Sequence, residues 1–224
     1  LKVPPRTKNS DPFWMNLKQG YHYLRRKPAL RNPIFLIGLI SLIVAPYITL
    51  FPVFAQEVFG GDVEEFSWLN SIAGFGALIG AIYMTSLKTT RTLLKVIIVA
   101  GLLLTANLIL FSFMKNFYAA LFFVMLAETG LLISISSTNT YLQTHVEERM
   151  RGRVISYYAM AFSGLQPIGN LLMGLLAHSI GVSYTVLIQG VLGMVCVAVF
   201  IPAYRKASER DIRIEGRNLS VVRK

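Results

Sequence analysis

The chain has 224 residues, of which 54% are hydrophobic and only 15% charged, and its mean hydropathy is +0.55. One soluble domain of this length cannot bury so much apolar surface, so the composition excludes such a domain and favours a membrane protein. The net charge of +11 does not predict nucleic-acid binding, because the cations lie between apolar runs rather than interleaved with aromatic residues on one surface.

The residues before the first apolar run, 1–32, form the first predicted unit, a cytoplasmic lead-in. Within it, residues 11–31 predict an amphipathic helix, since apolar side chains recur at helical spacing and cations flank them. We expect this helix to lie on the membrane surface and to be followed by a break at Pro28 and Pro33. A plain soluble linker helix is the alternative.

Six apolar runs follow, each about as long as the roughly 20 residues that a helix needs to cross the bilayer core. Membrane-spanning strands are about half as long and alternate apolar with polar residues, which these runs do not. The predicted units are thus a transmembrane domain at 33–203 and a cytoplasmic tail at 204–224. The predicted fold class is an all-α membrane protein with six transmembrane helices, at residues 34–55, 66–87, 93–113, 117–139, 154–176 and 182–203.

The positions of Lys and Arg give these spans an orientation, because short loops rich in cations stay in the cytoplasm. Of the 22 Lys and Arg residues, Lys115 alone falls on the opposite side of the predicted spans from the others. The sequence therefore predicts that both termini are cytoplasmic.

Glycine and proline interrupt several of the apolar runs. In the second run, small residues around Gly76 and Gly80 repeat every four positions, which predicts close helix packing rather than a nucleotide-binding turn, because no strand precedes them. Proline removes a backbone donor, so we expect the first and fifth spans to bend or to pack tightly, with static kinks as the alternative. The residues concerned in these two spans are Pro46, Pro52, Gly164, Pro167 and Gly169.

Glu128 is the only charged side chain well inside a predicted span. A carboxylate there is costly unless it is paired, hydrated or protonated. We interpret it either as a proton carrier or counter-charge for a cationic substrate, or as a carboxyl group hydrogen-bonded to a neighbouring helix. Asn139 lies about three turns further along nearly the same face. Gln166 and Asn170 share one face of the fifth span and are candidates for a cavity wall. Asn107 and Asn139 are further candidates for the transport site, and each of these amides equally suits hydrogen bonds between helices.

The sequence contains no catalytic or metal-binding constellation. Its one cysteine, Cys196, lies inside the last apolar run, and its three histidines are far apart, so no disulfide, zinc site or redox motif is predicted. No serine lies in a nucleophile elbow. We therefore expect neither enzymatic activity nor a metal or other cofactor.

Five stretches resemble the drug- and siderophore-exporter branches of the major facilitator superfamily. The stretch at 16–32, NLKQGYHYLRRKPALRN, resembles the end of their central cytoplasmic loop. Residues 51–61, FPVFAQEVFGG, and 69–81, LNSIAGFGALIGA, resemble helices seven and eight. Residues 146–156, VEERMRGRVIS, and 164–181, GLQPIGNLLMGLLAHSIG, resemble the loop before helix eleven and that helix. The chain is therefore similar to the carboxy-terminal half, helices seven to twelve, of a bacterial exporter of the enterobactin-exporter and macrolide-efflux branch.

The resemblance implies half of a major facilitator fold, built as a 3+3 inverted repeat, with the amino-terminal six-helix half as its partner. It implies alternating access, commonly driven by protons, in the bacterial inner membrane. It makes Arg151, Gly152 and Arg153 the motif of one cytoplasmic loop. The loop between helices eight and nine departs from the family pattern, since it keeps only Lys88 and Arg91 and has no acid. A gate lock at that loop is therefore not expected.

Two functional hypotheses of different kinds follow. The main one is half of a proton-coupled exporter of small amphipathic molecules such as drugs or siderophores, with the substrate, the lipid bilayer and the other half as its partners. The alternative is a complete six-helix membrane protein that acts as a homodimer or as a non-transporting subunit. The chain begins with Leu rather than Met, which is expected of an excised piece and equally of a trimmed start.

Overall fold

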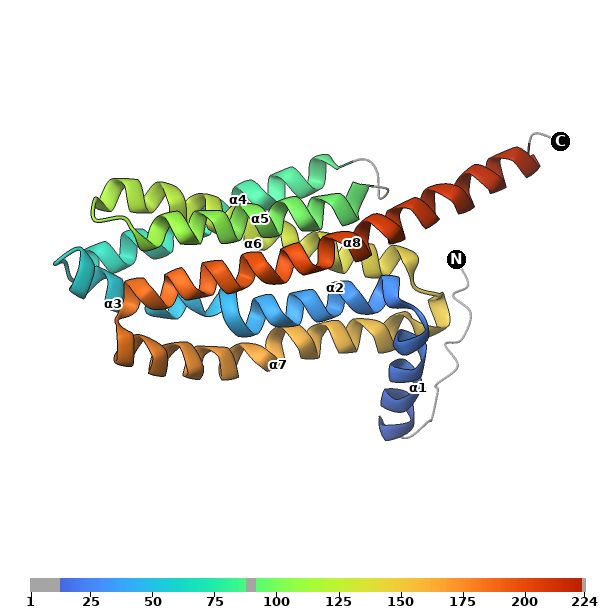
Figure 1. The fold of residues 1–224 in the computed structure, drawn as a ribbon, viewed down its shortest axis with the longest axis horizontal. Helices are drawn as coiled ribbons and strands as arrows, with labels where there is room; N and C mark the ends of the chain where they lie inside the picture. Colours follow the sequence, from blue (N-terminus) through green and yellow to red (C-terminus); the bar gives the residue numbers. More distant parts are fainter. Residues whose placement is uncertain (1–12, 88–91, 223–224) are drawn as a thin grey trace, which may run out of the picture.

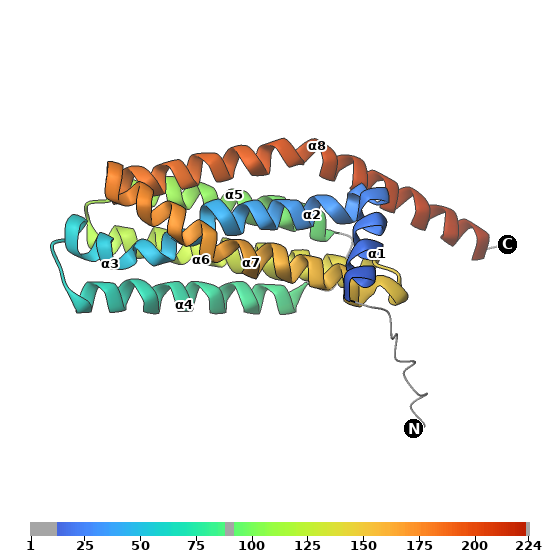
Figure 2. The ribbon, with the colours of Figure 1, turned by 90° about the horizontal axis from the view of Figure 1, so that it is seen from below.

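The computed structural model describes the backbone of residues 13–87 and 92–222, and the side chains of residues 14–87 and 92–204. Long helices run side by side in one bundle, and the short helix α1 (Phe13–Arg26) lies across one end of it (Figures 1 and 2). The described part of the chain contains helices and no strand. Six helical segments are long and apolar enough to cross a membrane, namely Pro28–Val58, Val63–Ser86, Leu93–Ser112, Phe117–His145, Glu148–Ile180 and Val182–Tyr204.

These segments confirm the predicted fold class, an all-α membrane protein with six transmembrane helices. Each predicted span falls on one of them, although several helices extend further than the apolar run that predicted them. The clearest case is the last helix, α8 (Val182–Val222), which passes the end of its span and projects from the bundle (Figure 1).

The first span changes helix type along its length. It begins as α2 (Pro28–Leu39), continues as a π-helix (Ile40–Val44) and a 3₁₀-helix (Ala45–Leu50), and ends as α3 (Phe51–Val53) and a second π-helix (Phe54–Val58). Proline is the second residue of the 3₁₀-helix, at Pro46, and the second residue of α3, at Pro52. Because proline has no N–H to bond the carbonyl four residues earlier, the regular α-helical ladder cannot continue there.

The predicted break before this span is at Lys27 alone, between α1 and α2. Pro28 opens α2, where its missing N–H costs nothing because the first helical N–H groups have no partner within the helix. Pro33 lies inside α2, which continues through it to Leu39. The prediction of a break at Pro33 is wrong, because one missing hydrogen bond in the second turn does not end a helix that is buried along one side.

The other spans are regular α-helices with recognisable ends. A capping box of Asp62 and Glu65 opens α4 (Val63–Ser86), and the Asn116 side chain accepts a hydrogen bond from the Ala119 N–H at the start of α6 (Phe117–His145). Helix α5 (Leu93–Ser112) lies between them in the chain, and Gly181 at φ 89° separates α7 (Glu148–Ile180) from α8.

Helix α6 lies at the centre of the packing, against α4 on one side and α5 on another, while α5 also packs against α8. Gly76 and Gly80 let the backbones of α4 and α6 approach. A Cβ added at Gly80 would lie 3.0 Å from the Thr129 carbonyl oxygen, and one added at Gly76 would collide with the Met125 carbonyl. Helix α7 packs on the first span, and the broken part of that span lies against α7 and α8.

Candidate functional site

The centre of the candidate site is a hydrogen bond between Tyr47 and Glu128. The Tyr47 hydroxyl donates to the Glu128 Oε2 over 2.6 Å, from the first span to α6. Tyr47 is fully buried, whereas Glu128 is half-buried, so its carboxyl group is only partly enclosed by protein. The carboxyl group thus has a partner on a neighbouring helix and remains open to a proton or a ligand.

The irregular first span is what brings Tyr47 to this position. Tyr47 follows Pro46 directly, inside the 3₁₀-helix that succeeds the π-helix. A π-turn is wider and a 3₁₀-turn narrower than an α-turn, so the residues after them point in directions that a continuous α-helix would not give. Such changes of helix type in a membrane helix are tolerated where the backbone is buried in protein or lines a cavity.

Helix α7 encloses the broken segment through Gly169. A Cβ added at Gly169 would lie 2.8 Å from the Pro46 Cγ and would collide with the carbonyl oxygen of Leu42, the carbonyl that Pro46 cannot bond. The Ser41 hydroxyl also donates to the Phe162 carbonyl of α7. The absence of a side chain at Gly169 therefore allows α7 to pack directly on the helix break.

The stretch of α6 around Glu128 is fixed from two further sides. The Thr129 hydroxyl donates to the Gly76 carbonyl of α4 over 2.9 Å. A Cβ added at Gly130 would lie 2.7 Å from the Ala100 carbonyl oxygen of α5. Glu128 is therefore held on a backbone that α4, α5 and the first span all contact, which restricts where its side chain can point.

The four amide side chains predicted as site residues together with Glu128 form no hydrogen bond with it in the described part of the chain. Asn107 donates to the Leu103 carbonyl of its own helix over 2.7 Å, and Asn139 accepts from Gln143 over 3.0 Å, about 16 Å further along α6 than Glu128. Within the described part of the chain, no hydrogen bond links Gln166 or Asn170 to Glu128. Asn170 follows Gly169, and its buried amide oxygen has no hydrogen-bond partner among the described residues.

The other two predicted residues of α7, Gly164 and Pro167, lie on its exposed side. Pro167 is exposed, and a Cβ added at Gly164 would meet only Met160 of the same helix. Helix α7 continues through Pro167 without a change of helix type. Pro52, in the short α3 of the first span, is also exposed. Of the five bending and packing candidates in these two spans, the structure brings together Pro46 and Gly169.

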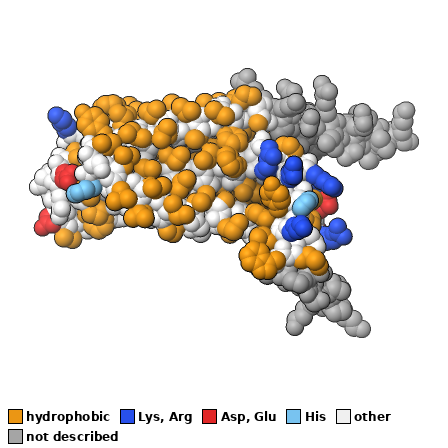
Figure 3. All heavy atoms as spheres, turned by 60° about the horizontal axis from the view of Figure 1, so that its bottom comes forward, with side chains coloured by type: hydrophobic (Ala, Val, Ile, Leu, Met, Phe, Trp, Pro, Cys, Tyr) orange, Lys and Arg blue, Asp and Glu red, His pale blue; other side chains and the backbone are white. Residues whose placement is uncertain are grey.

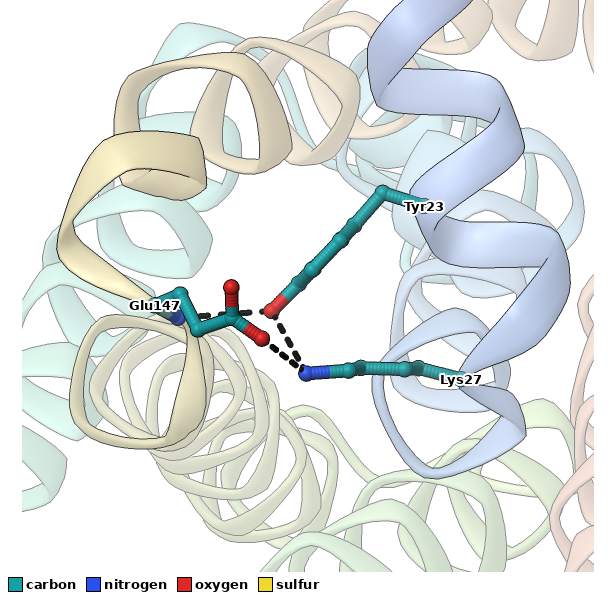
Figure 4. Close-up of polar contacts among 3 residues, drawn as sticks. All are labelled: Tyr23, Lys27 and Glu147. Atoms are coloured by element: carbon teal, nitrogen blue, oxygen red, sulfur yellow. Dashed lines mark hydrogen bonds and ion pairs between the residues drawn. The ribbon is translucent and has the colours of Figure 1, made fainter.

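A second polar cluster joins α1 to the loop between α6 and α7 (Figure 4). The Lys27 ammonium lies 2.6 Å from the Glu147 carboxylate and donates to the Tyr23 hydroxyl over 3.0 Å. The Glu147 N–H also donates to that hydroxyl, over 3.3 Å. Hydrogen bonding between the two charged groups raises the pKa of Lys27 and lowers the pKa of Glu147. Glu147 stands beside Arg149 in the sequence, but its ion-pair partner is Lys27, at the break between α1 and α2.

Further contacts dock α1 on the start of α7. The Arg153 guanidinium donates twice to the Asn16 side-chain oxygen, over 2.9 and 2.7 Å, and the Tyr157 hydroxyl donates to the Leu17 carbonyl over 2.9 Å. Of the predicted loop motif, Arg151 is exposed, and a Cβ added at Gly152 would meet no neighbour. The other predicted loop cations, Lys88 and Arg91, lie outside the described residues.

Sequence reasoning missed Tyr47 and the contact between Lys27 and Glu147. One feature of the sequence could have indicated Tyr47: it is a polar side chain directly after a proline within a span. Irregular backbone in a membrane helix occurs where it is buried in protein or lines a cavity. Lys27 had no such feature, because its partner is 120 residues away. Among the described residues, no three His, Cys, Asp or Glu side chains lie close enough together to hold a metal ion.

Six apolar helices and a carboxyl group held between two of them define a multi-pass membrane protein. Residues 2–216 match the transmembrane secretion effector family of the major facilitator type, and the chain belongs to this family. It is also 26% identical over 176 residues to the staphyloferrin A transporter of Staphylococcus aureus (strain NCTC 8325 / PS 47), which covers 77% of this chain and 43% of that protein. The chain thus spans less than half the length of this curated relative. The two names point to a transporter rather than to an enzyme.

Proposed function

We propose that this chain is the carboxy-terminal half of a proton-coupled exporter of small amphipathic molecules, working by alternating access. The observation that carries the proposal is the bond between Tyr47 and Glu128 at the break in the first span. An ionisable side chain within membrane helices marks an ion or substrate pathway by default, because keeping it there without a use is costly. Glu128 takes up a proton from one side of the membrane and releases it to the other.

Tyr47 couples this protonation to the shape of the first span. Its hydroxyl bonds the carboxyl group, and its backbone belongs to the 3₁₀ segment that α7 encloses at Gly169. A protonated carboxyl group is a weaker acceptor than a carboxylate, so proton uptake loosens this contact. The packing of the first span on α7 then differs between the protonated and the charged state, as alternating access requires.

The second half of the transporter covers the outer faces of α4 and α7. Of the six spans, these two have the smallest share of buried residues within their most apolar 18-residue stretch, 22% in α4 and 11% in α7. The greater length of the staphyloferrin A transporter supports further spans beyond this chain. Reading the gene upstream of residue 1 tests this part: six more spans support it, and a nearby start codon supports a complete six-helix protein.

The chain lies in the bacterial inner membrane with both termini in the cytoplasm. Figure 3 supports this orientation, since Lys and Arg side chains gather at the end of the bundle that carries α1 while hydrophobic side chains cover its length. Residues 1–32 are the lead-in, 33–203 the transmembrane domain and 204–224 the tail. The name of the relative supports siderophores as substrates, and the family description supports export.

The decisive experiment replaces Glu128 by Gln in the full-length protein. Efflux is measured in inverted membrane vesicles with an imposed pH gradient, over a panel of siderophores and drugs. We expect Glu128→Gln to abolish gradient-driven efflux while the protein remains in the membrane. The matched control is Glu148→Gln, which neutralises an exposed carboxylate at the start of α7 and should leave efflux unchanged. Normal efflux by Glu128→Gln would rule out the proton-carrying role.

A further inference from the structure

A cavity of about 300 Å³ opens between α1, α2 and α7 at the end of the bundle that carries α1. Its walls are apolar side chains from α2 and α7, among them Ile34, Leu39, Ala161 and Leu165. Gly38 forms part of the floor, where a Cβ would lie 3.3 Å from the Leu165 Cδ1. These residues make an apolar groove, called here the α1 groove, where α2 and α7 meet.

Two arginines stand at the mouth of the α1 groove. Arg25 comes from α1 and Arg31 from α2, and both side chains are exposed. Neither forms an ion pair within the described part of the chain, and no Asp or Glu lines the groove. Tyr21 and Tyr157 also line the groove, and each contributes a hydroxyl group. The mouth therefore offers an anion two cations that no carboxylate of the groove neutralises.

The groove descends from the membrane surface into the apolar part of the bundle. Between Arg31 and Leu39 the helix rises by roughly 12 Å, from a charged rim to an apolar wall. Helix α1 crosses the bundle at the rim and exposes Trp14, which is typical of a helix in the interfacial layer. A ligand that fills the whole groove must carry a negative charge at one end and a hydrocarbon chain at the other.

We infer that the α1 groove binds an anionic phospholipid, with its phosphate between Arg25 and Arg31 and one acyl chain along Gly38, Ala161 and Leu165. Basic pockets between membrane helices and beside amphipathic helices suit such headgroups. A free phosphate satisfies only the two arginines and leaves the apolar groove unfilled. A zwitterionic lipid fills the groove but adds an ammonium beside two guanidinium groups. The bound lipid joins α1 to α2 on the side opposite the Lys27–Glu147 pair, so both contacts hold α1 against the bundle.

The headgroup is tested by native mass spectrometry of the full-length protein with dioleoyl phosphatidylglycerol, phosphatidylethanolamine or phosphatidylcholine. We expect preferential retention of phosphatidylglycerol, weakened about fivefold for each arginine removed in Arg25→Gln/Arg31→Gln. The matched control, Lys18→Gln/Arg26→Gln, removes the same charge from exposed positions of α1 outside the groove and should keep the preference. Equal retention of all three lipids, or equal loss in both double variants, would overturn the inference.

Two further arms separate the lipid from a free anion and test the acyl chain. Millimolar inorganic phosphate should not displace phosphatidylglycerol; displacement would mean that the site recognises the phosphate alone. Ala161→Leu fills the groove and should reduce retention of the lipid, whereas Ala159→Leu, on an exposed part of the same helix, should not. Unchanged retention by a folded Ala161→Leu protein would place the acyl chain elsewhere.

Discussion

Gly169 of α7 lies directly against Pro46 of the first span, so that a Cβ added to the glycine would come within 2.8 Å of the proline Cγ. The same Cβ would collide with the carbonyl oxygen of Leu42. Proline removes the helical hydrogen bond to that carbonyl, and glycine lets a second helix cover the place where it is missing. The break in the first span and the glycine of the fifth span are therefore two parts of one contact.

Replacing Gly169 by Ala should push α7 away from this contact. Overpacking of a close helix contact costs about 1–3 kcal/mol, because backbone atoms cannot move aside as a flexible side chain can. We expect a lower midpoint of thermal unfolding in detergent and reduced efflux. Gly174→Ala is the matched control, since a Cβ at Gly174 would meet no neighbour. Equal destabilisation by the two variants would show that the contact with Pro46 is not the cause.

Tyr47→Phe removes one hydroxyl and keeps the buried ring. The lost hydrogen bond to Glu128 is worth about 1.5–3 kcal/mol if the carboxyl group is charged, so we expect gradient-driven efflux to fall by roughly 10- to 150-fold. Tyr158→Phe is a matched control, because the Tyr158 hydroxyl also bonds α6, at the Ile135 carbonyl over 3.1 Å, but touches no carboxylate. Efflux assays in vesicles compare the two. A similar loss in both variants would mean that bonds to α6 matter only for packing.

The six spans were predictable because a membrane helix is indicated by its own local sequence, a run of about 20 consecutive apolar residues. The helix break in the first span was harder to predict, because hydropathy carries no information on helix type. Pro46 and Pro52 indicate that the α-helical hydrogen bonding is interrupted, but they do not indicate the direction in which the Tyr47 side chain then points. Long-range partners were out of reach. Gly164 and Gly169 look alike in the sequence, yet only Gly169 touches another helix. Which glycine contacts a neighbouring helix depends on how α7 is rotated about its own axis, and that rotation cannot be predicted from a single sequence.

The ion pair of Lys27 and Glu147 should make the docking of α1 depend on pH. The lowered pKa of Glu147 means that its contribution is complete above the ordinary value of 4.5 and is lost as pH falls through the lowered pKa. The raised pKa of Lys27 means that its contribution is complete below 10.5 and is lost as pH rises through the raised pKa. The side chains of Lys27 and Glu147 are 42% and 61% exposed, so salt should weaken the pair throughout this window.

A nitroxide label at His22→Cys, with other reactive cysteines removed, reports the mobility of α1 by electron paramagnetic resonance. We expect an immobile label at pH 7 and a mobile one once the pH falls below the lowered pKa of Glu147, since acid then protonates this carboxylate. Glu147→Gln should give a more mobile label at pH 7 and abolish the acid step, while Glu148→Gln keeps both. An acid step that survives Glu147→Gln would assign it to another group.

Gln189 of α8 is fully buried, and both polar atoms of its amide lack a hydrogen-bond partner among the described residues. The glycines that follow it let α8 pack closely, with Gly190 against Ile109 of α5 and Gly193 against Val44 of the first span. Gln189→Met, of similar length, removes the unpaired amide from this tight place. We expect the free energy of unfolding to rise by about 1 kcal/mol, measured as a higher midpoint of thermal unfolding in detergent.

Asn107→Leu provides the comparison, because the Asn107 amide already donates to the Leu103 carbonyl of its own helix. Removing a satisfied amide should stabilise the protein less than removing an unpaired one. If Gln189→Met instead lowers both stability and efflux, the amide must bind something that the helices around it do not provide, such as a water molecule or the transported substrate. A stabilised Gln189→Met protein with normal efflux would show that the amide serves neither packing nor transport.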